Sequence, residues 1–208
     1  MTEESILSKG EYTRQAILDA AERLILSQGY HGTSMRQIAT QTGIAVGGIY
    51  NHFDGKEAIF AALLERHQPY SDIVAGMNSL SGDNPAELAE QAARMAVDKI
   101  LEDPVFFRLV LIDLLEFDGD TLMQFVGQLV PALLSLVTRI YASGQVRQDL
   151  PLPVMMRAFG GMIVFYALSE VIAFRDELPW FQLPTPIGDD IDWIGGMVDI
   201  FMNGVLAK

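Results

Sequence analysis

Apolar residues recur along the chain about every 3.6 residues, the period of an α-helix with one buried face. Within 13–27, Ile17, Ala21 and Leu24 follow this spacing, and Gly29 ends the pattern. We find no alternating apolar–polar stretch of useful length and no internal repeat, so the predicted fold is all-α. Further helices are expected after Ser34, at about 45–52, from Lys56 onward, and near 85–102, 104–117, 120–143, 153–174 and 190–206, with a loop at 175–190.

The short N-terminal helices carry specific start and stop signals. Ser34 and Gln37 have the S-x-x-Q spacing of a capping box, in which each side chain accepts a hydrogen bond from the other residue's backbone N–H. Gly43 follows as a turn residue suited to a positive φ angle. Ile49 and Phe53 are the expected apolar anchors of the second short helix.

Acidic residues and prolines predict further boundaries. Asp54 and Glu57, three residues apart, predict a cap for the helix that follows. Asp103 followed by Pro104 predicts an N-cap with proline at the first helical position. Pro131 lies inside a long apolar pattern and predicts a kink or break there.

Two short helices joined by a glycine turn, packed on a longer amphipathic helix, predict a helix-turn-helix unit. Such a unit can bind DNA because one helix fits the major groove, while helix N-termini and nearby hydroxyl or cationic groups hold phosphates. A plain helical hairpin with capping residues is the alternative interpretation.

Three runs make the interpretation more specific: 13–21 (TRQAILDAA), 29–39 (GYHGTSMRQIA), and 43–53 (GIAVGGIYNHF) followed by Lys56 and Glu57. Together they resemble the N-terminal region of the TetR/AcrR family of transcriptional regulators over residues 12–60. The resemblance implies a three-helix helix-turn-helix DNA-binding domain and a larger helical ligand-binding and dimerisation domain. We expect a flexible tail at 1–10, the DNA-binding domain at 11–56, and the effector-binding and dimerisation domain at 57–208.

The resemblance also implies which residues would contact double-stranded DNA. Tyr50, Lys56 and the helix start at Thr33 and Ser34 would hold phosphates. The full predicted set is Thr33, Ser34, Arg36, Ala45, Val46, Gly48, Tyr50, Asn51, His52 and Lys56. Gly48 departs from the family pattern, in which a hydroxyl residue is common there. The adjacent glycines at 47 and 48 weaken a helix, so either close approach of the backbone to DNA or tight packing on a neighbouring helix should compensate.

The charge distribution keeps a DNA-binding function open. The net charge is −13, but residues 1–68 hold 6 basic and 8 acidic side chains, while the other 140 residues hold 8 basic and 19 acidic ones. Nearly all the excess negative charge therefore lies outside the predicted DNA-binding region.

The C-terminal two thirds are rich in phenylalanine and methionine, which indicates either ordinary core packing or the wall of an effector pocket. The family resemblance implies a small-molecule effector, for which the candidate residues are Met95, Phe107, Leu111, Phe125, Met162, Phe165 and Tyr166. Asp113, Glu116 and Glu170 interrupt the apolar helices. We expect these carboxylates on the solvent side, although one facing inward would favour a cationic ligand over an anionic one. The expected effector is lipophilic and either cationic or uncharged.

Residues 155–174 are apolar around nearly the full circumference of the predicted helix, so a second subunit should cover one side. The last helix supports this with one apolar stripe of Ile191, Ile194, Met197 or Val198, Phe201 and Val205, whereas Trp193 and Ile200 lie off the stripe. Both contain a glycine pair that would permit close helix crossing. The predicted interface of a homodimer comprises Gly161, Ile194, Gly196, Met197 and Phe201.

Several chemistries are not expected. The chain has no cysteine, and its three histidines lack metal-ligand spacing. We find no catalytic or phosphate-loop motif, so we predict no enzyme, cofactor or metal. The acidic N-terminus and the absence of a long uninterrupted apolar run predict no secretory signal, no membrane association and a cytoplasmic location.

The sequence therefore predicts a ligand-responsive transcriptional regulator, expected to be a repressor, that binds a palindromic operator as a homodimer. Two alternatives remain: a ligand-binding or protein-interaction module of the same fold without sequence-specific DNA binding, and an enzyme on a helical scaffold. Whether the effector releases DNA or promotes binding stays open.

Overall fold

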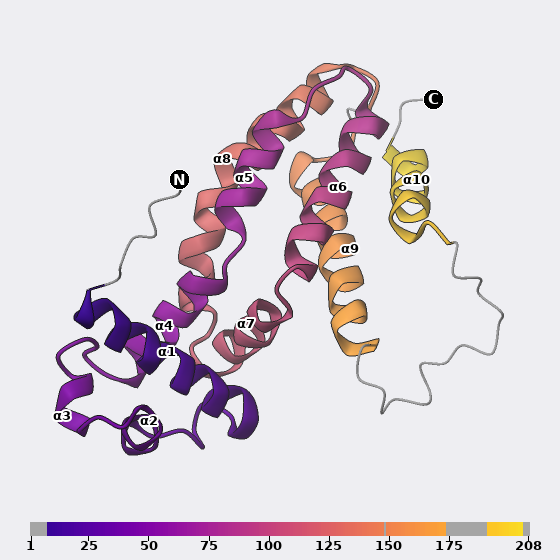
Figure 1. Ribbon diagram of the computed structural model, residues 1–208. Coiled ribbons are helices and arrows are strands. Elements are labelled where there is room, and N and C mark those ends of the chain that lie inside the picture. The colour runs from indigo at the N-terminus through magenta and orange to yellow at the C-terminus, as the bar shows by residue number, and fades with distance from the viewer. Residues whose placement is uncertain (1–7, 148, 174–190, 206–208) are drawn as a thin grey trace, which may run out of the picture. The chain divides into compact units, whose positions relative to one another are not determined.

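The computed structural model describes residues 8–147, 149–173 and 191–205, and these residues form ten α-helices (Figure 1). Their bounds are α1 Lys9–Gln28, α2 Met35–Thr42, α3 Val46–Ile49, α4 Lys56–His67, α5 Tyr70–Ser79, α6 Pro85–Leu101, α7 Pro104–Glu116, α8 Asp120–Ala142, α9 Leu152–Ala173 and α10 Trp193–Val205. The all-α prediction is confirmed.

Two compact units divide the chain, and each is described by itself. The first unit comprises residues up to Gln68 together with Arg108–Leu122, and the second comprises Pro69–Phe107 and the residues from Met123 onward. The first unit thus extends beyond the predicted domain boundary at residue 56, because α4 packs on α1 through a fully apolar face. That face consists of Ile59, Phe60, Leu63 and Leu64.

In the first unit, α1, α2 and α3 form the predicted three-helix arrangement (Figure 1). Ile17, Ala21 and Ile38 are buried between the helices. Two ion pairs also join α4 to α1, from Arg66 to Asp19 (2.6 Å) and from His67 to Glu22 (2.8 Å).

Most predicted helix ends of this unit are confirmed. Ser34 and Gln37 form both hydrogen bonds of the capping box, and Gly43 ends α2 in the left-handed conformation with φ 71°. The cap predicted at Asp54 is wrong: Gly55 is the N-cap of α4 and no side chain caps it, since Asp54 lies one residue too early. Regular helix in α3 ends at Ile49, because residues 50–52 continue as a tighter turn.

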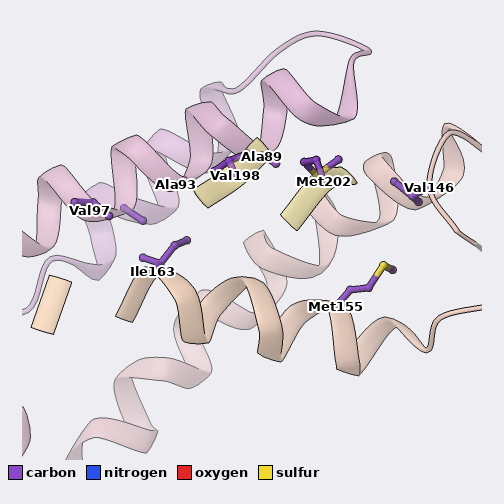
Figure 2. Close-up of a cluster of buried hydrophobic side chains, with 9 residues drawn as sticks. Ala89, Ala93, Val97, Val146, Met155, Ile163, Val198 and Met202 are labelled. Carbon is purple, nitrogen blue, oxygen red and sulfur yellow. The ribbon is translucent and has the colours of Figure 1, made fainter. Parts of the chain in front are cut away.

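In the second unit, α6 packs against α5, α9 and α10. Figure 2 shows the central cluster, in which Val97 of α6, Ile163 of α9 and Val198 of α10 point toward one another. Asp192 caps α10 by accepting a hydrogen bond from Gly195 N–H (2.9 Å), and it also pairs with Arg94 of α6. Apolar packing and this ion pair together hold α10 on α6.

The helices of the second unit differ in part from those expected from the sequence. Helix α5, at Tyr70–Ser79, had not been predicted; Ile73 and Met77 form its buried side. Helix α8 continues through Pro131, which excludes a break there, and the kink stays a prediction. Pro104 begins α7 as predicted, and Asp103 accepts a hydrogen bond from Val105 N–H (3.0 Å). The predicted loop at 175–190 lies outside the described residues.

Candidate nucleic-acid interface

The predicted DNA-contacting residues differ widely in exposure. Ser34, Arg36, Ala45, Tyr50 and Asn51 are exposed; Val46, Gly48, His52 and Lys56 are half-buried; Thr33 is buried. The exposed members all lie on α2, on α3 or directly beside these helices. Five of the ten residues named from the sequence are therefore exposed enough to contact DNA, and the other five are half-buried or buried.

At the N-terminus of α2, both hydroxyl groups already have partners. Thr33 is only 2% exposed and its hydroxyl donates to Gly29 O (2.9 Å). The Ser34 hydroxyl donates to Gln37 Oε1 (2.7 Å). The predicted phosphate contact through the Thr33 hydroxyl does not fit this burial. Backbone N–H groups of the first helical turn, at Met35 and Arg36, have no acceptor within a helix and suit an anion better.

The two glycines of α3 are not required by packing within the described residues. A Cβ atom on Gly47 would meet no atom within 4 Å, and one on Gly48 would come no closer than 3.8 Å to Ile44. Of the two explanations for this glycine pair, the structure does not support tight packing on a neighbouring helix. Gly47, which is exposed and was not among the predicted contacts, joins the candidate surface.

The ammonium group of Lys56 faces the interior of the first unit. It donates to the backbone carbonyls of Tyr30 (2.7 Å) and Thr33 (2.8 Å), and lies 3.9 Å from the centroid of the Tyr30 ring. Burial lowers the pKa of Lys56, while the negative charges of Glu116 and Glu57 act in the opposite direction. The sequence did not reveal these contacts because they join residues 23 and 26 positions apart.

The end of α7 packs against the same loop. Phe117 lies 4.9 Å from the Tyr30 ring and 5.0 Å from the Phe60 ring, measured between centroids. Glu116 pairs with His31 at 2.5 Å. Segment 108–122 therefore belongs to the helix-turn-helix unit through specific aromatic and ionic contacts.

Asp113 is fully buried in the first unit, which corrects the expectation that it faces solvent. Its Oδ2 accepts a hydrogen bond from Leu122 N–H (2.9 Å), whereas Oδ1 has no hydrogen-bond partner. The backbone carbonyl of Asp113 also accepts from Phe117 N–H and Gly119 N–H. Asp113 thus organises the turn between α7 and α8, in which Asp118 adopts a positive φ of 53°.

We expect Asp113→Ala to destabilise the protein and Asp113→Asn not to. Alanine removes the acceptor for Leu122 N–H, at a cost of about 1 kcal/mol or more. Asparagine has the same shape and keeps an oxygen that can accept from Leu122 N–H. In urea denaturation at neutral pH, the free energy of unfolding of Asp113→Asn should equal or exceed that of the wild type. The free energy of unfolding of Asp113→Ala should be lower than that of the wild type. An alanine variant as stable as the wild type would contradict this role.

The predicted effector residues do not share one cluster. Met95 packs with α5 and α8 beside Ile73 and Met77, whereas Met162 and Tyr166 pack in the cluster of α6, α9 and α10. Phe107 is buried, Leu111 and Phe165 are exposed, and the side chain of Phe125 lies outside the described residues. Burial and, secondarily, the charge of Glu170 raise the pKa of Tyr166.

Two of the hollows on the described surface have volumes of about 430 and 440 Å³, and neither of these two is lined by a predicted effector residue. One lies beside α2 and is lined by Leu24, Ser34, Arg36, Gln37, Thr40 and Gln41. The other lies between the α5–α6 loop and the end of α8, beside Arg139. Among the described residues, no three histidine or carboxylate side chains are grouped so that they could hold a metal ion.

The predicted dimer residues divide between two faces of α9 and α10. Gly161 and Gly196 are exposed, and a Cβ atom on either would meet no atom of the described chain within 4 Å. Ile194 and Phe201 instead pack in the cluster of the second unit, while Met197 is half-buried. Large apolar residues that the sequence had not assigned to the interface lie exposed on these helices: Val154, Val164, Phe165, Trp193 and Ile200.

The packing of α2 on α1 and of α3 on α2, with an exposed start of α2, is typical of a helix-turn-helix DNA-binding unit. Residues 17–63 match the family model described as bacterial regulatory proteins, tetR family. Over this region the chain matches the TetR family, as its N-terminal runs indicate.

Relatives with transcriptional functions support the assignment. The chain is 28% identical over 125 residues to the transcriptional repressor BepR of Brucella suis, an alignment that covers 58% of this chain and 56% of BepR. It is 28% identical over 149 residues to the repressor AcnR of Corynebacterium glutamicum, covering 69% of this chain and 73% of AcnR. The chain therefore spans only just over half the length of BepR.

Solved structures show the same fold over almost the whole chain. NalD of Pseudomonas aeruginosa, a repressor of the MexAB-OprM multidrug efflux pump, superposes with a TM-score of 0.69 at 22% identity, covering 95% of this chain and 98% of NalD. FadR of Bacillus subtilis, in complex with stearoyl-CoA, gives 0.66 at 19% identity, covering 91% of this chain and 98% of FadR.

Proposed function

We propose that the protein is a homodimeric repressor that binds a palindromic operator and is released or modulated by a small lipophilic effector. DNA binding is assigned to residues 11–56, and effector binding and dimerisation to residues 57–208. The relatives are transcriptional regulators by name, so we propose no enzymatic activity and a cytoplasmic site of action.

The observation that carries the proposal is the set of exposed groups around α2 and α3. The first turn of α2 offers backbone N–H groups beside the exposed cation of Arg36, and both suit a phosphate. Tyr50, 53% exposed just after α3, adds a phenolic donor. These groups would orient α3 on the duplex without reading its sequence.

Sequence readout would come from α3 and the residues beside it. Ala45 and Val46 cannot make bidentate hydrogen bonds to bases, but they can contact thymine methyl groups. Asn51 is exposed and can donate and accept at a base edge, and His52 lies next to it. DNA shape would supply the remaining specificity.

Selection of bound duplexes from a random DNA library at low salt tests the proposal. We expect a palindromic consensus. If each subunit neutralises two or three phosphates, log affinity should fall against log salt with a slope of roughly −4 to −5. No enrichment by folded, dimeric protein would instead favour a ligand-binding module that lacks sequence-specific DNA binding; the donor-poor α3 would suit that module.

The exposed apolar face of α9 and α10 supports the homodimer. Val154, Gly161 and Phe165 follow the spacing of a single stripe on α9, and Trp193, Gly196 and Ile200 do so on α10. Leu152–Glu170 is also long and apolar enough to span a membrane by length and composition alone. A helix that packs against a second subunit meets the same criterion, and pairing of this face would place two helix-turn-helix units on successive half-sites.

An effector would act by preferring the dimer state in which the recognition helices do not match the half-sites. Stearoyl-CoA in the FadR structure is an example of a long-chain ligand on the same fold. Thermal-shift assays with cationic, neutral and carboxylate lipophiles would distinguish the candidate classes. Stabilisation by carboxylates alone would overturn the preference for a cationic or uncharged ligand.

We expect the double variant Gly47→Ala, Gly48→Ala to be more stable than the wild type but to bind operator about tenfold more weakly. Alanine raises helix propensity by up to about 1 kcal/mol per position, and the structure has room for both methyl groups. The same methyl groups would obstruct close approach of the backbone to DNA. Melting temperature and operator titration measure the two effects, and unchanged affinity would exclude that approach.

A further inference from the structure

Lys56 is the first residue of α4, but its ammonium group contacts the loop between α1 and α2. Its Nζ donates to Tyr30 O at 2.7 Å and to Thr33 O at 2.8 Å, and these bonds use two of its three N–H donors. The ammonium also lies 3.9 Å from the Tyr30 ring centroid, within the range of a cation–π interaction.

The loop that Lys56 holds leads directly into α2. Thr33 precedes Ser34, the N-cap residue of α2. Within the loop, Thr33 N–H donates to Tyr30 O (3.2 Å), the Thr33 hydroxyl donates to Gly29 O (2.9 Å), and Gln28 Nε2 donates to Gly32 O (3.0 Å). Lys56 therefore links this hydrogen-bonded loop to α4. The residue that links them lies more than twenty positions after the loop in the sequence.

Burial and aromatic contacts hold the Tyr30 ring in place beside the Lys56 ammonium group. Tyr30 is 7% exposed, and its ring makes edge contacts with the rings of Phe60 and Phe117. The ring centroids lie 5.5 Å apart for Phe60 and 4.9 Å apart for Phe117. Glu57 and Glu116 lie close enough to affect both Tyr30 and Lys56 electrostatically, so the ammonium has nearby negative charge as well as carbonyl acceptors. Two of the three N–H donors of Lys56 are thus engaged with the loop, and only the third is left for any DNA phosphate.

We propose that Lys56 contributes to operator binding as a positioning residue: it fixes the loop 29–33, and thereby the N-terminus of α2, instead of neutralising a phosphate. This inference rests on the proposed DNA-binding function. It assigns one charge-dependent phosphate contact in each subunit to Arg36, which is exposed on α2.

The test compares Lys56→Met, Lys56→Arg and Arg36→Met in the full chain, using operator titrations at several salt concentrations. Methionine keeps an unbranched chain but removes charge and donors. Lys56→Met should weaken operator binding at least tenfold at every salt concentration and leave the salt slope unchanged. Arg36→Met should reduce the slope by about two, or one phosphate in each subunit. Arginine at position 56, which keeps donors and charge, should recover most of the lost affinity.

Amide hydrogen exchange of the DNA-free protein supplies an independent readout. Lys56→Met should accelerate exchange of the described loop amides at 29–34 at least tenfold, whereas Arg36→Met and Lys56→Arg should leave them near the wild-type rate. Should Lys56→Met be too unstable to assay, Lys56→Gln replaces it with the same expectations. If the wild type selects no operator, the proposed function fails, but hydrogen exchange still tests the loop.

Two results would overturn the proposal. One is a salt slope that falls by about two in Lys56→Met with unchanged loop exchange, because that combination identifies a phosphate contact. The other is wild-type affinity and wild-type loop exchange in Lys56→Met, since the loop then does not depend on this side chain.

Discussion

Replacing both Phe165 and Ile200 by glutamate is expected to convert the proposed dimer into monomers and to lower operator affinity at least a hundredfold. These side chains are 70% and 76% exposed in the single chain, so the substitutions should not disturb its core. In the proposed interface, each subunit would bury two carboxylates without partners, which costs several kcal/mol. Analytical ultracentrifugation and operator titration measure the two consequences.

Met123→Glu is the matched control for this prediction. Met123 is 64% exposed on α8, outside the proposed interface, and it is replaced by the same charged residue. The control should remain dimeric and bind operator normally. A double variant that sediments as a dimer would refute the interface, and monomers formed by the control would place the interface on α8.

Gly32→Ala is expected to have the second largest effect, because the loop 29–33 has no room for a side chain at this position. A Cβ atom on Gly32 would lie 2.3 Å from the backbone carbonyl oxygen of Gln28. Since that atom belongs to the backbone, the loop must move, and Lys56 and Thr33 would lose part of their hydrogen bonding. We expect a loss of roughly 2 kcal/mol in the free energy of unfolding and at least a thirtyfold loss of operator affinity.

Gly10→Ala provides the comparison for Gly32→Ala. Gly10 lies in the first turn of α1, and its added Cβ would meet Ser8 Oγ at 3.9 Å, an ordinary contact. This variant should match the wild type or exceed it slightly in stability, since alanine favours the helix. Urea denaturation and operator titration of both variants decide the matter; wild-type behaviour of Gly32→Ala would show that the loop adapts without cost to α2.

Local signals in the sequence predicted much of the helix-turn-helix unit. The Ser34–Gln37 capping box, the turn at Gly43 and the inward positions of Ile49 and Phe53 all occur in the structure. Such features depend on residues at most four positions apart, so a short stretch of sequence contains the necessary information. The cap at Asp54 was wrong for a related reason: spacing alone did not show that the N-cap is Gly55, one residue later.

Contacts between distant residues decided the rest. Whether Thr33 and Lys56 face DNA or the interior, and whether Asp113 faces solvent or the core, depends on segments that meet only after folding. Likewise, α9 is apolar nearly all round, so periodicity could not show which of its faces covers α6 and which remains exposed at Phe165. The sequence by itself thus determined the all-α fold, most of the helices and the resemblance of the N-terminal region to the TetR family. Tertiary structure decided which polar groups already have partners and which apolar faces do not, because burial depends on neighbours supplied by other helices.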